Sequence, residues 1–325
     1  MAVSKAVLGD PTIAQAMIQG GVEFIADSRL ENIQRMRKSG VLAQFVLLRT
    51  ALSQAELIVQ WVDISLNSEL ATLKALSHYA EAKQRIHRVI IMVELGDLRE
   101  GVCPCDLSSF FSEALTLSHL EIIGIGCNLA CYGGVKPDAH NMHELSVQVD
   151  RLEHEFGLDL KIISGGNSAN YDWYTSKSKT DRTDDRINNL RLGESILLGR
   201  ETVHRASIPG LHTRAFQLFA EVIESKRKPS MPLGEICQDA FGNVPCFTDR
   251  GMHQRSIVAL GRQDVLVSGL SSRQAVTIIG ASSDHLILDS GDRVLQIGEE
   301  VQFDLDYGAL LAVMTSPFVR KEFLP

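Results

Sequence analysis

Short apolar runs alternate with segments of helical periodicity along roughly the first two hundred residues of the chain. Near-continuous apolar runs of this kind are typical of parallel strands that are covered by helices. Eight strand-and-helix repeats in this length predict an α/β fold, a closed (β/α)8 barrel of the TIM type, with an open doubly wound sheet as the alternative. The runs are residues 3–8, 22–28, 45–49, 61–67, 88–95, 121–128, 160–167 and 191–199.

Helix signals occupy the segments between the runs. Asp10 is placed to cap a helix, Pro11 suits its first turn, and Gly20 marks its end. A second periodic segment, residues 140–157, ends on Gly157. Both segments therefore predict helices that connect consecutive strands.

The pattern changes after residue 225, where SKRKPSMPLGE predicts a charged, proline-containing linker. Beyond it, short strand-like runs are separated by turn residues such as DSGD. We therefore expect a barrel domain over residues 1–228 and a C-terminal β-rich domain over residues 229–325. The later runs are residues 255–261, 274–281, 285–289, 299–305 and 309–314.

Composition and charge narrow the class of protein. The net charge of −8 argues against a nucleic-acid-binding surface, and no apolar run approaches the length of a membrane span. No export signal is recognised before the first run, so we expect a soluble, cytoplasmic protein. The six cysteines lack the spacing of a zinc site, which favours reduced thiols and no bound metal.

Candidate chemistry collects at the predicted carboxyl ends of the strands, where barrel enzymes place their sites. Lys5 lies in the first apolar run, either as an exposed edge lysine or as an amine with a chemical role. Residues 164–170, SGGNSAN, form either a phosphate-binding nest or an ordinary turn. Arg191 lies inside the eighth run, where it forms either a structural ion pair or part of a ligand site.

Further polar residues follow the other strands. Asn128 ends the sixth run, and Arg99 follows a glycine turn after the fifth, as either a carboxylate clamp or a solvated charge. Arg29 and Asn32 follow the second run. A lysine on the first strand, a phosphate nest and a buried arginine together describe a pyridoxal phosphate site, in which the lysine forms a Schiff base with the cofactor.

Several motifs resemble those of the alanine racemase-type (fold type III) pyridoxal phosphate enzymes: VSKAVLGDP, GCNLACYGG, GGNSAN and LRLGESILLG. The stretches RSIVALGRQDV, IIGASSDHLILD and YGALLAVMTSPFV look like the branch that contains ornithine racemase and related amino-acid racemases. The resemblance covers nearly the whole chain. It implies a homodimeric racemase that interconverts the L and D forms of ornithine or a similar basic amino acid.

The resemblance also implies roles at matching positions. Lys5 is expected to hold the cofactor and to act as one base, and Arg191 is expected to meet the ring nitrogen. Substrate contacts are expected from Arg99, Arg262 and Asp284. The remaining cofactor contacts are expected from Asn128, Ser164, Asn167, Ser168, Gly193 and Glu194.

Three departures from the family pattern accompany the resemblance. Arg262 stands where the family has the tyrosine that serves as the second base, so we expect Asp284 and His285 in that role. Met92 stands near the place of a modified lysine that precedes the substrate arginine. The chain begins almost on its first strand, so an N-terminal strand and helix found in relatives are expected to be missing. Further candidates for the second base are Asp264 and Tyr307.

Other functions stay open on the sequence. A lyase of the D-threonine aldolase type needs a metal, for which His285 has no obvious partner in the sequence. A non-catalytic pyridoxal phosphate-binding protein of this fold lacks a β-rich domain, and a barrel that binds some other phosphorylated metabolite is a third reading. For a basic substrate, Asp284 or Glu94 is placed to meet the distal ammonium group.

Overall fold

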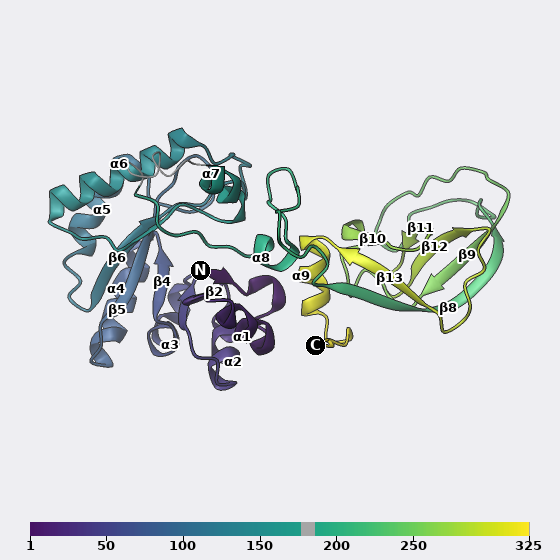
Figure 1. Cartoon of the computed structure of the whole chain (residues 1–325), viewed down its shortest axis with the longest axis horizontal. Coiled ribbons are helices and arrows are strands. Elements are labelled where there is room, and N and C mark those ends of the chain that lie inside the picture. Colours follow the sequence, from purple (N-terminus) through teal and green to yellow (C-terminus); the bar gives the residue numbers. More distant parts are fainter. Residues whose placement is uncertain (177–185, 325) are drawn as a thin grey trace. The chain divides into compact units, whose positions relative to one another are not determined.

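The computed structural model describes residues 1–176 and 186–324. It divides into two compact units, Met1–Thr213 and Arg214–Pro325 (Figure 1). Each unit has its own sheet and its own apolar core, so each is described separately. No helix in the described part of the chain is both long and apolar enough to cross a membrane.

Unit 1 is a parallel barrel. Its named strands pair in chain order, β1 to β7, and every pair is parallel. Beyond β7, Ser164 pairs with Asn189, and Leu192 then pairs with Ala2, both in parallel. This short segment occupies the eighth position and joins β7 to β1, which confirms the predicted barrel. The strands are β1 (Ala2–Val3), β2 (Phe24–Asp27), β3 (Gln44–Leu47), β4 (Ile64–Asn67), β5 (His87–Met92), β6 (Leu120–Gly126) and β7 (Ile162–Ser164).

Helices cover the outer face of the curved sheet (Figure 1). The Asp10 side chain accepts hydrogen bonds from the N–H groups of Thr12 and Ile13, which confirms it as the cap of the first helix. Gly157 ends the longest helix in the left-handed conformation, at φ 66°, as predicted. The helices are α1 (Pro11–Gln19), α2 (Leu30–Lys38), α3 (Ala55–Trp61), α4 (Leu70–Ala82), α5 (Leu107–Ala114), α6 (Ala139–Phe156), α7 (Tyr171–Ser176) and α8 (Glu194–Leu198).

Alternate strand residues fill the interior of the barrel. Successive strand side chains point to opposite faces, so one set packs inside and the next set meets the helices. Full burial of each large aliphatic side chain stabilises the barrel by about 1.5–3 kcal/mol. The interior cluster consists of Val3, Ala26, Val46, Ile64, Leu66, Ile90, Met92 and Ile123. This cluster fills the inside of the barrel below the carboxyl ends of the strands.

Two of the predicted strands are wrong in part. The first run is a strand only at Ala2–Val3, and Lys5–Val7 form a 3-10 turn, η1. Leu8 and Gly9 then adopt positive φ angles of 55° and 57°, which turn the chain into α1. The eighth run bridges its neighbours only as far as Leu192, and α8 follows at once. Apolar composition alone does not separate a buried strand from a short buried helical turn.

Unit 2 contains a six-stranded antiparallel sheet and the helix α9 (Tyr307–Thr315). Its strand order is β10-β13-β8-β9-β12-β11, and its apolar residues form one core. It is the predicted β-rich domain. The strands are β8 (Gln217–Pro229), β9 (Met252–Val258), β10 (Leu270–Ser272), β11 (Thr277–Ala281), β12 (Leu286–Gly291) and β13 (Glu300–Leu305).

Two segments of unit 2 differ from the prediction. Residues 225–229, expected in a linker, complete β8 and pair with β9, so the long strand that begins at Gln217 belongs wholly to unit 2. Residues 309–314, expected as a strand, lie in α9, where Asp306 caps the helix. The buried positions Ala309, Leu310, Val313 and Met314 follow a helical spacing that a short apolar run conceals.

Candidate active site

Lys5 lies at the carboxyl end of β1, as the first residue of the turn η1. The residue before it, Ser4, is fully buried and donates a hydrogen bond of 2.7 Å from Oγ to Oδ2 of Asp27. The Ser4 N–H also donates to the Ala26 carbonyl, which continues the β1–β2 pairing. Both bonds go to β2, so the backbone directly before Lys5 is fixed against that strand.

Asp27 supports this turn from beneath. Its carboxylate is fully buried and accepts hydrogen bonds from Asn32 Nδ2 at 3.0 Å and from the Arg29 N–H at 2.9 Å. Burial raises the pKa of the Asp27 carboxyl above its ordinary value, and the hydrogen bonds oppose this shift. Asn32 is therefore buried and holds the Asp27 carboxylate. A Cβ on Gly9 would lie 2.6 Å from Asn32 Cβ, so glycine is required there.

Arg191 is a buried cation, with 5% of its surface exposed, in the short segment that pairs with β1 and β7. Nη1 donates to Ser164 Oγ at 2.6 Å, and Nη2 donates to the Cys127 carbonyl at 2.7 Å and to Asn128 Oδ1 at 3.4 Å. No carboxylate pairs with it among the described residues, which excludes the structural ion pair there. Burial lowers the pKa of Arg191 from its ordinary value. The cation is therefore held by neutral acceptors.

Asn128 and Asn167 are joined beside this arginine. Asn167 Nδ2 donates to Asn128 Oδ1 at 3.1 Å and to the Leu129 carbonyl at 2.8 Å. Two donors on Oδ1 fix the orientation of the Asn128 amide. Its Nδ2 is then left buried without a hydrogen-bond partner in the described part of the chain. A buried donor in this state indicates an acceptor on a ligand.

The predicted phosphate nest closes onto α8. Ser168 Oγ accepts hydrogen bonds from the N–H groups of Gly193 at 3.3 Å and Ser195 at 3.2 Å, and it contacts Ser195 Oγ at 3.0 Å. Ser195 was not predicted, because its only sequence signal is a hydroxyl in an apolar helix. The side chain of Glu194, predicted to contact the cofactor, forms an ion pair with Arg205.

The loop after β5 brings Arg99 towards the same mouth. Its side chain forms an ion pair with Glu100 and contacts Cys131 Sγ, and both of these residues act electrostatically on Arg191. Glu94, expected to meet a distal ammonium group, accepts backbone N–H bonds within the loop. Met92 belongs to the apolar interior of the barrel.

The remaining predicted residues lie in unit 2, where two loops hold them together. The N–H of Arg262 donates to the Ser282 carbonyl, and the Gln263 N–H donates to Ser283. On the second loop, His285 Nδ1 lies 2.8 Å from Asp284 Oδ1, which lowers the pKa of Asp284. Both side chains are largely exposed. Of the further candidates, Asp264 is buried and bonds to the Ser316 hydroxyl, and Tyr307 begins α9.

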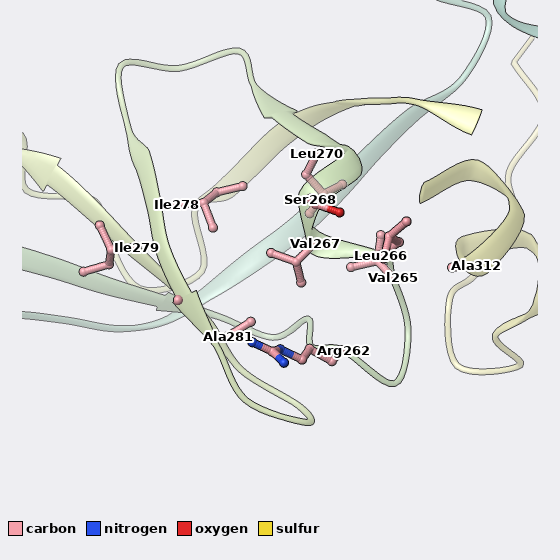
Figure 2. A pocket seen from close by; sticks show the side chains of 11 residues that line it. Arg262, Val265, Leu266, Val267, Ser268, Leu270, Ile278, Ile279, Ala281 and Ala312 are labelled. Carbon is pink, nitrogen blue, oxygen red and sulfur yellow. The ribbon is translucent and has the colours of Figure 1, made fainter. Parts of the chain in front are cut away.

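Arg262 also lines a pocket of about 780 Å³ within unit 2. Figure 2 shows it as the charged side chain among apolar ones from η5 (Val267–Gly269), β11 and the flanking loop. The guanidinium lies 4.1 Å above the centre of the Phe241 ring, a cation–π contact. Stacking of this kind holds the Arg262 side chain in place.

The floor of unit 1 fits pyridoxal phosphate. The Asn128 amide has a buried donor for a ligand beside the Arg191 cation, as a cofactor ring would require. The N–H groups of Gly193 and Ser195 converge on Ser168 Oγ, so this turn gathers donors of the kind that bind a phosphate. Lys5 supplies an amine at the same ends of the strands. No group of three or more metal-binding side chains occurs among the described residues.

Known proteins are similar to this chain in sequence and in fold. Residues 1–199 match the family model described as the N-terminal domain of alanine racemase. An ornithine racemase of Acetoanaerobium sticklandii is 42% identical over 99% of this chain and 91% of its own length. A lysine racemase of Thermotoga maritima is 37% identical over 99% of this chain and 90% of its own length.

Solved structures of alanine racemases have the same fold. The enzyme of Streptomyces lavendulae superposes with a TM-score of 0.74 at 16% identity, over 96% of this chain and 87% of that one. The enzyme of Bartonella henselae, which carries covalently bound pyridoxal phosphate, gives 0.70 at 18% identity, over 97% and 89% of the two chains.

Proposed function

The chain belongs to the alanine racemase family, and we propose that it is a pyridoxal phosphate-dependent racemase of ornithine or a similar basic amino acid. The observation that carries the substrate class is the match at 42% identity to an ornithine racemase over nearly the whole of both chains. The second relative acts on lysine, another amino acid with a distal amine. The cofactor is supported by the floor of donors around Arg191 and Asn128.

Each group of the floor has a proposed task. Lys5 holds the cofactor, Arg191 meets its ring, and Ser168 with the backbone of Gly193 binds its phosphate. When bound, pyridoxal phosphate supplies an electron sink that stabilises negative charge at the substrate Cα. The buried cation Arg191 disfavours a second positive charge beside it, because like charges repel in a site from which water is excluded. Arg99 binds the substrate carboxylate through its planar fork.

Racemisation also needs two proton carriers, one on each face of the substrate. We propose Lys5 Nζ for one face, where it takes or returns the Cα proton. For the other face we propose the pair Asp284 and His285, whose hydrogen bond keeps the carboxylate ionised and the imidazole oriented.

The family resemblance supports a homodimer in which unit 2 of one subunit supplies the second base to the barrel of the other. Six free cysteines support a reducing, cytoplasmic setting.

The first test uses the purified protein loaded with pyridoxal phosphate. The wild type should show the visible absorbance of the lysine-bound cofactor, and Lys5→Ala should lose it. Chiral analysis after incubation with a panel of L-amino acids should then find D-ornithine or D-lysine. Retention of the band in Lys5→Ala would remove Lys5 from its role. A normal band without any D-product would favour a non-catalytic carrier of the cofactor.

A second test addresses the proposed dimer. Lys5→Ala and Asp284→Asn subunits are each expected to be inactive, and they are co-expressed with different tags and purified as a mixed dimer. If the second base comes from the partner, one site of the mixed dimer is intact and activity returns. A mixed dimer that stays inactive while its Asp284→Asn subunit, which keeps Lys5, binds the cofactor would show that the two bases act within one chain.

A further inference from the structure

The loop Glu94–Gly101 surrounds one arginine with three carboxylates, and each carboxylate has a different task. Glu94 accepts hydrogen bonds from the backbone N–H groups of Gly96 at 2.5 Å, Leu98 at 3.1 Å and Arg99 at 3.2 Å. It therefore fixes the path of the backbone up to Arg99. Leu98, directly before it, has a φ of 55°, a conformation that costs a leucine about 1 kcal/mol.

Asp97 binds the neighbouring loop. Although it lies in a surface loop, it is only 1% exposed. Its carboxylate accepts N–H bonds from Tyr132 at 3.0 Å, from Cys131 at 3.3 Å and from Val135 at 3.4 Å. Cys131, which contacts the Arg99 side chain, is therefore held in place by the same loop.

Glu100 binds the guanidinium itself. Its two carboxylate oxygens accept from Nε and Nη2 of Arg99, which is the two-pronged geometry of a strong arginine–carboxylate pair. Cys131 Sγ accepts from Nη1. An arginine has five N–H donors, so the contacts made by the described residues leave one on Nη1 and one on Nη2. The remaining Nη2 donor lies on the edge of the guanidinium away from Glu100, which is the edge left for a ligand.

We propose that Glu100 is a positioning residue that fixes the plane of the Arg99 guanidinium, so that its remaining edge binds the α-carboxylate of the substrate. The proposal rests on the racemase function proposed above. An arginine without such a partner would lose side-chain conformational entropy each time it bound a carboxylate. An arginine held by Glu100, here called a braced arginine with Glu100 as its brace, has already lost that freedom. Glu100 lies partly exposed, at 30% of its side chain, as a group beside an open mouth should.

The rival role for Glu100 is direct recognition of the distal ammonium group of a basic substrate. The two roles predict different partners for the same carboxylate. A brace affects every ligand that has an α-carboxylate, whether or not it has a distal amine. An ammonium receptor affects only ligands with the distal amine. Norvaline has the carbon chain of ornithine without that amine, and norvalinamide lacks the free carboxylate as well.

The experiment uses the holoenzyme and Glu100→Gln, which keeps the shape and removes the charge. Glu113→Gln, an exposed glutamate on α5, is the matched control. Dissociation constants for L-norvaline and L-norvalinamide are read from the cofactor absorbance, and KM and kcat are measured with L-ornithine and L-lysine. We expect Glu100→Gln to weaken norvaline binding and to raise KM by a similar factor of about ten, with kcat changed by less than about threefold.

The remaining arms separate the brace from a general loss of structure. Norvalinamide binding should be unchanged in Glu100→Gln, and Glu100→Asp, which keeps the charge, should recover part of the norvaline affinity. In an Arg99→Ala background, Glu100→Gln should weaken norvaline no further, because the brace acts only through Arg99. Equal weakening of norvaline and norvalinamide would overturn the proposal, as would unchanged norvaline with weakened ornithine. If the wild type racemises neither ornithine nor lysine, the proposed function fails, while the two norvaline ligands still test the brace.

Discussion

The two sides of the barrel mouth hold their arginines in opposite ways. Arg191 is buried and held by a carbonyl, a hydroxyl and an amide oxygen, with no carboxylate beside it in the described structure. Arg99 is partly exposed and paired with Glu100, in a loop built from three carboxylates. No hydrogen-bonded carboxylate among the described residues offsets the positive charge of Arg191, so this charge is available to a ligand that binds beside it. The second has a charged partner that shields it in water.

This difference suits two kinds of ligand. A buried cation without a counter-charge costs free energy unless a bound ligand offsets that cost. The site around Arg191 therefore suits a cofactor that stays bound. A half-exposed pair holds its shape when no substrate is present, so the β5 loop suits a ligand that comes and goes at each turnover. Mutations on the two sides should therefore separate stability and cofactor retention from substrate affinity.

The largest effect is expected at Arg191. Arg191→Ala removes the Arg191 hydrogen bonds to three buried acceptors and opens a cavity, so the free energy of unfolding should fall by about 3 kcal/mol and the cofactor should be lost. Urea unfolding and the visible absorbance measure the two effects. Arg191→Lys, which keeps the charge without the planar fork, should recover part of the stability. An unchanged unfolding midpoint in Arg191→Ala would contradict the contrast.

A smaller and different effect is expected at Arg99. Arg99→Ala should lower kcat/KM for L-ornithine by a factor of about 10²–10³, because the substrate carboxylate is no longer positioned. Stability should change by less than about 0.5 kcal/mol, since the side chain is partly exposed. Steady-state kinetics and urea unfolding of the same preparations test both statements. Loss of the cofactor from Arg99→Ala would contradict the contrast, because it would show that the β5 loop also serves to retain the cofactor.

The smallest effect is a dependence of stability on pH at Asp27, the buried carboxyl beneath the Lys5 turn. Burial raises its pKa in the folded protein above the ordinary 3.8, so the folded state holds the proton to higher pH than the unfolded state. The free energy of unfolding should therefore fall as pH rises from about 3.8 through the raised pKa, a loss that Asp27→Asn should lack. Urea midpoints across this range measure the slope. Asp159→Asn, at an exposed carboxylate, should keep the wild-type slope.

Much of the fold was predictable because its signals are local and repeated. Apolar runs at regular spacing marked the strands, and the cap at Asp10 and the stop at Gly157 marked two helices. The structure also brings Asn128, Ser168 and Arg191 to one site, although the sequence had placed them at the ends of the sixth and seventh runs and inside the eighth. This follows from the geometry of a parallel barrel, in which all carboxyl ends meet at one face.

What the sequence did not reveal has a common cause. The residue types in a segment do not tell where the chain turns, which way a side chain points or how deeply it is buried. Lys5 sits in a turn because Leu8 and Gly9 reverse the chain, although the run around it reads as a strand. Asp97 and Glu100 are acidic residues in a polar loop, and nothing in the sequence separates them from solvated charges. Their tasks depend on partners more than thirty positions away or on the orientation of one guanidinium.

The central claim, a cofactor-dependent racemase of a basic amino acid with Lys5 as one base, is tested most directly in deuterated water. L-ornithine is incubated with the holoenzyme, and the product is resolved by chirality and by mass. We predict D-ornithine with deuterium at Cα in the wild type, and neither D-product nor exchange in Lys5→Ala. Recovery of L-ornithine without deuterium and without D-product, from a fully loaded wild type, would contradict the account; the same experiment on L-lysine shows whether the failure is confined to one substrate.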